Sequence, residues 1–462
     1  ILRGITFGIS NIFVIEGNKY MAKLIEKEFS NENFIKITTT EARKFFKTSN
    51  DKFDLIDVSL YDSYATSPIL SLNENYLYTV ESLYEMYNLL TSDGIISITR
   101  WAIYPAIDAI KIFSSIIEMC ERYNITDYKK KLFFIRSHNT VTLCLSKTNL
   151  TKENIIYLTR KLGFDILYHY TLKKEMLNQY FEESEYLNFE TLTNILSEKR
   201  KLYLKNFPFD IKATTDNRRY YHNIFRIKPF RYILSRSLQF LPFNEWGSGI
   251  FIILLVFILI TGFTTILIPS FFLARKEKKI DSIKLVKSFL YFFLIGNAYF
   301  FVEIPYIQKL ILFIGHPIYS FSIVLFSMLL FSSIGSLISS KVEERYQKML
   351  LCILPLILFL SIFAINYVNK IFSFANMFSR IIITLFLIGP SAFLMGIPFP
   401  IMIEKIKIQY LSLTPIMWGI NGFASVVSSI LASLLSILYG FNFVLILAVI
   451  FYTIAINLIS WK

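Results

Sequence analysis

Cysteine and histidine are scarce in this sequence. Its 462 residues include three cysteines and four histidines. Cys120, Cys144 and Cys352 lie far apart and form no closely spaced pair, so the sequence predicts neither a disulfide framework nor a metal site. The histidines are equally scattered, at His138, His169, His222 and His316. A metal-dependent enzyme is therefore not expected.

Acidic residues are also few compared with basic ones. The sequence has 34 aspartates and glutamates and 48 lysines and arginines, which gives a net charge of +14. A nucleic-acid-binding protein would have such a balance, but no pattern of basic and aromatic residues accompanies it. Basic runs at 199–205 and 218–219 come shortly before the apolar half of the chain, where such charges usually meet lipid headgroups. The charge predicts a lipid bilayer as partner and no nucleic acid.

Long apolar runs are confined to the second half of the chain, although hydrophobic residues make up 54% of the whole and the mean hydropathy is +0.49. Up to about Trp246 apolar and charged residues alternate, whereas from Gly249 onward the runs are long enough to span a bilayer. We expect an α/β domain over 1–170, a charged connector over 171–247 and a helical membrane domain over 248–462.

The first half alternates short β-type runs with helical patterns. Apolar runs at 12–15, 34–37, 53–60 and 95–101 are separated by segments of helical spacing, which predicts a mostly parallel, doubly wound sheet. Ligands of such sheets lie beyond the carboxyl ends of the strands, so chemistry is expected in the polar loop 63–76. Glu16 ends the first of these runs. It could accept hydrogen bonds from both hydroxyls of a ribose, or it could be a solvated acid at a strand end.

Several motifs, in order along the chain, resemble the spermidine-synthase-like proteins, and especially their membrane-fused members. In the first half these are the segments 1–19, 41–43, 74–81, 93–95, 99–101, 210–211 and 215–218. In the second half they are 302–304, 315–317, 396–400 and 418–422. The resemblance covers nearly the whole chain and implies a class I methyltransferase-like fold for the α/β domain.

The resemblance implies S-adenosylmethionine or its decarboxylated form as co-substrate, and in soluble relatives the transfer of an aminopropyl group to a polyamine. Glu16 would then contact the ribose and Glu41 would lie near the adenine. Glu74 and Tyr78, in the motif 74–81, would lie at the site of a small-molecule amine. Ser59 would lie beside the co-substrate, because aligning Asp54-Leu55-Ile56 with the family places it at the catalytic position.

The sequence departs from the family at three places. The glycine-rich loop would precede Ile1, so the chain is expected to lack the first strand and that loop, and residues 1–247 alone are expected to be poorly stable and unable to bind S-adenosylmethionine. Glu41 replaces an aspartate. Ser59 replaces the catalytic aspartate, and serine cannot hold the amine's charge or accept its proton. Asp62, at the strand exit, is the better candidate for the catalytic acid–base residue, since Asp57 lies within the apolar strand and could face the sheet interior.

The second half predicts about seven spans, near 248–273, 286–313, 318–340, 349–368, 381–403, 413–438 and 441–460. Glu303 lies inside the second span beside Pro305. An unpaired charge at mid-bilayer costs at least about 3 kcal/mol, so Glu303 should face the bundle and pair or be protonated. It could bind a cation or proton, or form a structural hydrogen bond to a neighbouring helix. Gly389-Pro390 and the segment 396–400 are expected to interrupt the fifth span, as in transporters.

Small residues in the sixth span, Ser425, Ser428, Ser429, Ala432 and Ser433, predict close helix packing. The loops richest in lysine and arginine are 275–287, 341–348 and 405–407, which the positive-inside rule places in the cytoplasm. Seven crossings would then put the α/β domain outside, where S-adenosylmethionine is not expected. We expect an additional re-entrant or interfacial segment near 231–243, with the α/β domain on the cytoplasmic side of the plasma (inner) membrane.

Two functions follow. The first is a membrane-tethered transferase that binds S-adenosylmethionine or a similar ligand, with Glu16, Glu41, Asp62 and the motif 74–81 in its site. The second is a transporter or membrane scaffold with a degenerate, non-catalytic sheet domain. It rests on Glu303, the proline-broken fifth span and Ser59 at the catalytic position.

Overall fold

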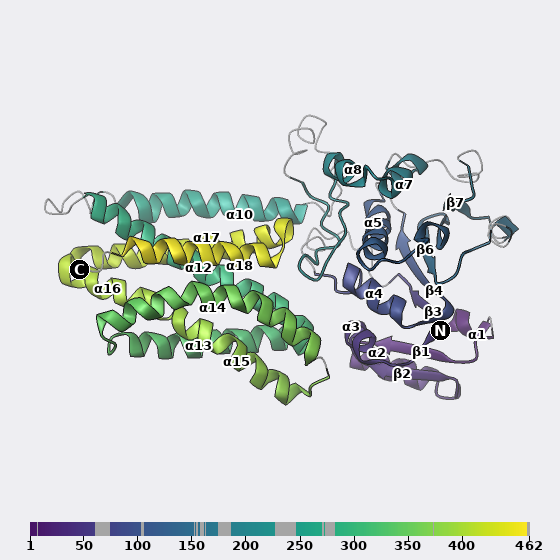
Figure 1. The fold of residues 1–462 in the computed structure, drawn as a ribbon, viewed down its shortest axis with the longest axis horizontal. Coiled ribbons are helices and arrows are strands. Elements are labelled where there is room, and N and C mark those ends of the chain that lie inside the picture. The colour runs from purple at the N-terminus through teal and green to yellow at the C-terminus, as the bar shows by residue number, and fades with distance from the viewer. Residues whose placement is uncertain are drawn as a thin grey trace. The chain divides into compact units, whose positions relative to one another are not determined.

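A computed structural model shows that the chain folds into two units, Ile1–Ser248 and Gly249–Lys462 (Figure 1). The structure describes residues 1–6, 8–60, 74–102, 106–151, 163–173, 186–226, 246–269, 282–372 and 374–459, with a few single positions between these ranges. Each unit is considered by itself.

The N-terminal unit begins with a strand–helix–strand motif. A short helix, α1 (Leu2–Thr6), precedes β1 (Ile12–Glu16), α2 (Lys19–Glu28) and β2 (Ile35–Thr39). The Asn18 side chain caps α2 by accepting from the N–H of Tyr20 and of Met21, which satisfies donors that have no partner within the helix. The two strands pair in parallel, with Ile12 opposite Ile35 and Glu16 opposite Thr39.

A second sheet has five strands in the order β3-β4-β6-β5-β7. These are β3 (Phe53–Val58), β4 (Leu90–Trp101), β5 (Leu132–Arg136), β6 (Thr140–Ser146) and β7 (Asp165–Tyr168). Only the β3–β4 pair is parallel; the other three pairs are antiparallel. The sheet is therefore mixed, and the prediction of a mostly parallel sheet was wrong for β5, β6 and β7. The three residues between β5 and β6 cannot form the long crossover that parallel strands require.

Ser92-Asp93-Gly94 is a combination of residues typical of a turn, but the segment forms part of a strand. Residues 92–94 lie within β4, where the pairing is irregular, because Phe53 pairs with Leu90 but Leu55 pairs with Ile95. A Cβ atom on Gly94 would lie 2.7 Å from the backbone oxygen of Phe53. The glycine therefore allows a close approach of two strands inside the sheet.

Helices and the connector complete the core of this unit. The helices are α3 (Ala42–Thr48), α4 (Val80–Asn88), α5 (Ile107–Arg122), a 3₁₀ turn η2 (Tyr128–Lys130), α7 (Phe189–Leu196) and α8 (Arg200–Asn206). Helix α3 contacts α4, α4 contacts α5, and α5 contacts α7. The buried cluster that includes Phe113 and Phe134 also contains Ile195, Ile211 and Tyr221. The charged connector thus contributes to the core of the α/β unit.

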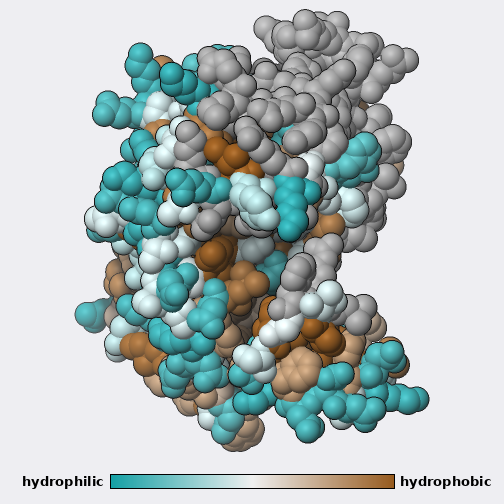
Figure 2. Space-filling view, turned by 90° about the vertical axis from the view of Figure 1, so that its right-hand side faces the viewer, coloured by the Kyte–Doolittle hydropathy of each residue, from teal (hydrophilic) through white to brown (hydrophobic). Residues whose placement is uncertain are grey.

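The surface of the N-terminal unit is uneven in polarity. Figure 2 shows hydrophobic residues near the middle of the face in view, with mainly hydrophilic residues to their left. Strand β4 pairs with one edge of β3. Leu55, in the middle of β3, is nevertheless 50% exposed. In the part of the chain that the structure describes, no strand pairs with the other edge of β3. This edge of β3 is therefore open.

The C-terminal unit is helical. Its elements are α10 (Trp246–Gly262), a π-helical turn η6 (Phe263–Leu267), α12 (Ser282–Ile314), α13 (Pro317–Ser339), α14 (Glu344–Ile371), α15 (Met377–Met395), α16 (Pro398–Gln409), a 3₁₀ turn η7 (Leu411–Leu413), α17 (Thr414–Tyr439) and α18 (Phe441–Leu458). Seven helical segments in the described part are long and apolar enough to cross a membrane, which confirms the predicted number. They indicate a membrane protein.

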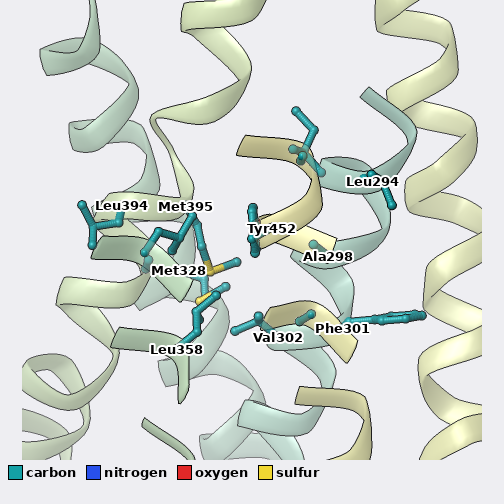
Figure 3. Close-up of a cluster of buried hydrophobic side chains, with 14 of the residues drawn as sticks. Leu294, Ala298, Phe301, Val302, Met328, Leu358, Leu394, Met395 and Tyr452 are labelled. Atoms are coloured by element: carbon teal, nitrogen blue, oxygen red, sulfur yellow. The ribbon is translucent and has the colours of Figure 1, made fainter. Parts of the chain in front are cut away.

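Helix α12 lies at the centre of this unit and contacts α13, α14, α15, α17 and α18. Figure 3 shows Ala298 and Val302 of α12 in one cluster with Met328 of α13, Leu358 of α14 and Tyr452 of α18. By contrast, only 6% of the apolar span in α10 is buried within the unit. Its exposed isoleucine, leucine and phenylalanine side chains would face lipid.

The fifth span is interrupted once. Helix α15 ends at Met395 and α16 begins at Pro398, so Gly396 and Ile397 separate them. The break predicted at 396–400 is confirmed, whereas the one predicted at Gly389-Pro390 was wrong, because Pro390 lies inside the continuous α15. A proline removes one helical hydrogen bond, but packing can maintain a membrane helix across that position.

Small residues bring neighbouring membrane helices close together. The hydroxyls of Ser425 and Ser428 in α17 lie 3.5 Å from the backbone oxygen of Gly296 in α12. A Cβ atom on Gly335 would overlap the backbone oxygen of Phe393, and one on Gly396 would overlap that of Ser332. The close contact of α13 with α15 and the residue that follows it therefore needs glycine at Gly335 and at Gly396.

We predict that Gly335→Ala lowers the free energy of unfolding of the full-length protein in detergent by about 1–3 kcal/mol, and with it the melting temperature. The added methyl group would push α13 away from α15. Gly422→Ala is the matched control, because nothing lies within 4 Å of a Cβ atom at Gly422 on α17. Equal melting temperatures for the two variants would contradict the close α13–α15 packing.

Candidate functional site

Two predicted site residues, Glu16 and Glu41, meet at the carboxyl ends of β1 and β2. Glu16 ends β1, and one oxygen of its carboxylate accepts from the N–H of Asn18 at 2.7 Å. The N–H of Thr40 donates to the backbone oxygen of Glu16 at 3.1 Å, which holds the end of β2 against that of β1. Glu41 follows at the start of α3, and a Cβ atom on Gly17 would lie 3.0 Å from its Oε1. The two carboxylates therefore flank Gly17.

The Glu41 carboxylate is not used by its own helix. Glu41 occupies the N-cap position of α3, yet its side chain makes no capping hydrogen bond. Glu41 is exposed, and Glu16 is half-buried. Both carboxylates can therefore accept hydrogen bonds from a ligand that lies over Gly17.

Ser59 and Asp57 lie together at the end of β3. The Ser59 hydroxyl donates to Oδ2 of Asp57 at 2.6 Å, and both residues are exposed. The expectation that Asp57 could face the sheet interior was therefore wrong, since the open edge of β3 leaves it accessible. Asp62, the predicted catalytic residue, lies outside the described residues, as do positions 63–73 of the loop expected to carry chemistry.

The predicted motif 74–81 is joined to residues more than 100 positions later. Arg43 of α3 lies at the centre of this junction, which we call the Arg43 cluster and define as Arg43, Thr79, Glu85 and Asp216. Arg43 donates through Nε to Glu85 Oε2 at 2.6 Å and through Nη2 to Asp216 Oδ2 at 2.8 Å. Its Nη1 donates to Thr79 Oγ1 at 2.8 Å and to the backbone oxygen of Tyr76 at 3.0 Å. The Arg43 guanidinium thus holds three separate segments together.

Charge in the Arg43 cluster favours ionised Asp216. Burial alone would raise the pKa of Asp216, but the charge and hydrogen bonds of Arg43 hold that pKa below its ordinary value. The Arg43 side chain is 7% exposed, so a guanidinium without its carboxylates would be costly here.

Glu74, predicted to contact substrate, is used within the protein. Its carboxylate accepts from the Tyr76 hydroxyl at 2.7 Å and from Nη1 of Arg219 at 3.3 Å, and the Tyr220 hydroxyl lies at 3.5 Å. Burial raises the pKa of Glu74, and the Arg219 charge opposes this rise only in part. Its position therefore assigns it an anchoring contact between the loop before α4 and the segment 216–220.

Tyr78, the second residue predicted at the substrate, is completely buried. Its hydroxyl accepts from Nη1 of Arg100 at 2.8 Å, and the Arg100 guanidinium lies 4.7 Å from the centre of its ring. Arg100 also pairs with Asp108 at 3.3 Å, and Nδ1 of His222 lies 3.1 Å from the same Asp108 carboxylate. In this arrangement Tyr78 belongs to the core, and a substrate could reach it only if the neighbouring segments moved.

Residues that sequence reasoning did not assign to the site hold it together. Arg43, Arg100 and Asp108 supply most of the polar contacts, and backbone bonds add to them, from Asn75 N–H to Arg219 and from Val80 N–H to Thr214. A signal for them exists in the sequence, since single charged residues occur beside apolar ones in α3, β4 and α5. Their partners could not be inferred, because these lie far away along the chain.

Glu303, the predicted membrane-embedded acid, lies on α12 and is 7% exposed. Pro305 lies two residues later within the same continuous helix. Glu303 is remote in sequence from the N-terminal carboxylates and belongs to the other unit.

Comparison with known proteins found no match to any protein-family model, to any curated protein or to any solved structure.

We predict that Arg43→Met destabilises the N-terminal unit by about 1.5–3 kcal/mol, because the partly buried carboxylates of Glu85 and Asp216 lose the charged hydrogen bonds of the guanidinium. Arg122→Met, which removes a 39% exposed partner of Glu81, should cost about 0–1 kcal/mol. The fully buried Cys120 provides the readout, since its thiol reacts only when this unit opens. Similar Cys120 reactivity in the two variants under increasing urea would contradict the structural role of Arg43.

The pH dependence of stability follows from Asp216. Its pKa is lower in the folded than in the unfolded protein, so its contribution is present above about pH 4 and is lost as the pH falls through the folded-state pKa. We therefore expect Asp216→Asn to destabilise the unit strongly at neutral pH and progressively less in acid. Asp127→Asn, at an exposed position, should cost little at any pH. Cys120 reactivity again measures both, and a pH-independent effect of Asp216→Asn would count against the ion pair.

Proposed function

We propose that this membrane protein carries a nucleoside-ligand-binding domain of the methyltransferase type in its N-terminal unit. The ligand is S-adenosylmethionine or its decarboxylated form, and the site lies at the carboxyl ends of β1, β2 and β3. The observation that carries the proposal is the position of two acids, Glu16 and Glu41, beside Gly17 at the carboxyl ends of the parallel strands β1 and β2.

Two parallel strand pairs, which belong to separate sheets, lie near each other in the N-terminal unit. The chain passes from β1 to its parallel neighbour β2, and later from β3 to its parallel neighbour β4. The rings of Phe13 in β1 and Phe53 in β3 meet edge to face, with centroids 5.2 Å apart, so these two strands lie near each other. In open α/β sheets ligands bind beyond the carboxyl ends of the parallel strands, which is where Glu16 and Glu41 lie.

The side chains at this edge suit a nucleoside. A carboxylate at the end of a strand can accept hydrogen bonds from both ribose hydroxyls. In Glu16 the Oε1 atom accepts from the N–H of Asn18, and Oε2 is the second carboxylate oxygen. Glu41 lies across Gly17, where it can accept from an exocyclic amino group. Gly17 leaves room between them, because a side chain there would press on Glu41.

A transferase step on an amine would use the acids at the end of β3. The amine arrives as a cation and must lose a proton before it attacks, so a carboxylate has to hold the cation and accept that proton. Asp62 is the proposed base, and the exposed Asp57, which accepts from Ser59, supplies a second carboxylate at this edge. Glu74 and Tyr78 hold the segment before α4 through their contacts with Arg219 and Arg100. The proposal places the N-terminal unit on the cytoplasmic side of the plasma (inner) membrane, where this co-substrate is found.

We predict that Glu16→Gln weakens binding of S-adenosylmethionine to the full-length protein by about tenfold or more, since a charged hydrogen bond contributes about 1.5–3 kcal/mol. Calorimetry with S-adenosylmethionine, its decarboxylated form and methylthioadenosine measures this affinity. Glu28→Gln is the matched control, because it makes the same change at the exposed far end of α2, roughly 15 Å away along the helix.

The outcomes separate binding from catalysis. If none of the three compounds binds, the proposed site is wrong. If Glu16→Gln and Glu28→Gln lose affinity equally, the ligand does not contact Glu16. Binding without transfer to an amine acceptor would leave a ligand-binding but non-catalytic domain, the alternative that Ser59 suggests.

A further inference from the structure

Glu303 is a buried acid for which the described part of the chain provides no counter-charge. It is 7% exposed, in the middle of a helix of 33 residues. No hydrogen-bond donor or cation among the described residues lies within bonding distance of its carboxylate; its electrostatic neighbour is Tyr299, one turn earlier on α12. The alternative of a structural hydrogen bond to a neighbouring helix therefore lacks a donor among the residues that the structure describes.

Helical spacing shows which way Glu303 faces. Residues separated by three, four or seven positions share one face of a helix, so Gly296, Tyr299 and Glu303 lie on the same face of α12. Gly296 packs against Asn421 and Ala424 of α17, and Tyr299 contacts the Ser332 hydroxyl of α13. Glu303 therefore lies on the side of α12 that is directed toward α13 and α17.

The buried cations of this unit are engaged elsewhere. Lys309, on another face of α12, donates to the side chain of Asn442 on α18. Arg380 of α15 donates to the backbone oxygens of Phe313, at the end of α12, and of Ala375. The other buried ionisable side chains around α12 are tyrosines: Tyr291 and Tyr306 of the same helix and Tyr452 of α18. Tyr291 and Tyr306 donate to Pro398 and to Ser361.

From this arrangement we propose that Glu303 is the binding site of a small monovalent cation inside the membrane unit. The occupant is a proton, or a sodium ion in its place. A bare carboxylate in a bilayer is too costly to persist, and a bound proton or metal cation removes the net charge. When the metal ion replaces the proton, the carboxylic acid O–H bond breaks, the carboxylate coordinates the ion and the proton leaves to water, so the site stays neutral throughout. The hydroxyl oxygen of Tyr299, the electrostatic neighbour of Glu303, is of the ligand type that a hard cation prefers.

A hydrophobic carbodiimide tests this proposal, because such reagents modify the protonated form of a membrane-buried carboxyl. The full-length protein in membrane vesicles is treated, and the modified residue is located by mass spectrometry. We expect modification at Glu303, decreasing about tenfold for each pH unit once the site has lost its proton, as for a single titrating group. At one pH above the midpoint of this decrease, the labelling of Glu303 in sodium chloride is then compared with its labelling in choline chloride at the same ionic strength.

Protection by sodium over choline identifies the metal ion as a competing occupant, and equal labelling in the two salts identifies the proton alone. Either result supports the proposal. Glu303→Gln should abolish this label, and Glu404→Gln, at an exposed position on α16, should leave it unchanged. Label at Glu303 that does not vary with pH or salt would show a permanently neutral structural acid, and absence of label until the protein is denatured would also overturn the site.

A second measurement covers the case that Glu303→Gln folds poorly. The thermal stability of the wild-type protein in detergent is recorded across pH in both salts, with Glu404→Gln alongside. Cation binding to the folded form predicts a melting temperature that rises with the concentration of the occupant. A melting temperature that responds to neither proton nor sodium would contradict the proposal, and this result would leave the nucleoside site untouched.

Discussion

The N-terminal unit depends on one buried guanidinium. Arg43 lies in a short helix near the start of the chain, and its fork of donors reaches a carboxylate of α4 and another 173 positions away at Asp216. Because a buried arginine must be paired to be tolerated, the segment that carries Asp216 cannot leave without exposing an unsatisfied charge. The ion pairs therefore fix the connector onto the α/β core and, through Thr79, fix the start of α4 as well.

The membrane unit follows a different constraint, because apolar side chains gain little by leaving lipid for each other. Its helices associate through close backbone approach at Gly296, Gly335 and Gly396 and through hydroxyls that bond to backbone oxygens. Each buried polar group then needs an explanation. Arg380 has one in the carbonyl groups at the end of α12, and Lys309 has one in Asn442. Glu303 differs from these two because the described residues provide no counter-charge for it, and this difference is the basis for the proposed cation site.

The two proposed sites differ in how their acids are used. At the end of β1 and β2, the carboxylates of Glu16 and Glu41 lie at the surface, beside a glycine that leaves space for a ligand. Glu74 and Asp216 are instead engaged with Arg219 and Arg43. Resemblance to a family can point to a motif, but burial and partners separate the residues that shape a site from those free to contact a ligand.

Local properties of the sequence were enough for much of the fold. Seven apolar spans, the break after Met395 and the strands near 12–16, 53–58 and 95–101 could be predicted, because hydropathy and side-chain period are set by residues close together in the chain. The resemblance assigned Glu16 to the ribose and Glu41 to the adenine of a ligand, and the structure places each of them at the end of a strand. Other features depended on contacts between distant segments. The pairing of β6 with β4, the continuity of α15 through Pro390 and the burial of Tyr78 against Arg100 were decided by such contacts. So were the partners of Arg43. A sequence shows that a charge must be satisfied, but only the folded chain brings the opposite charge to it.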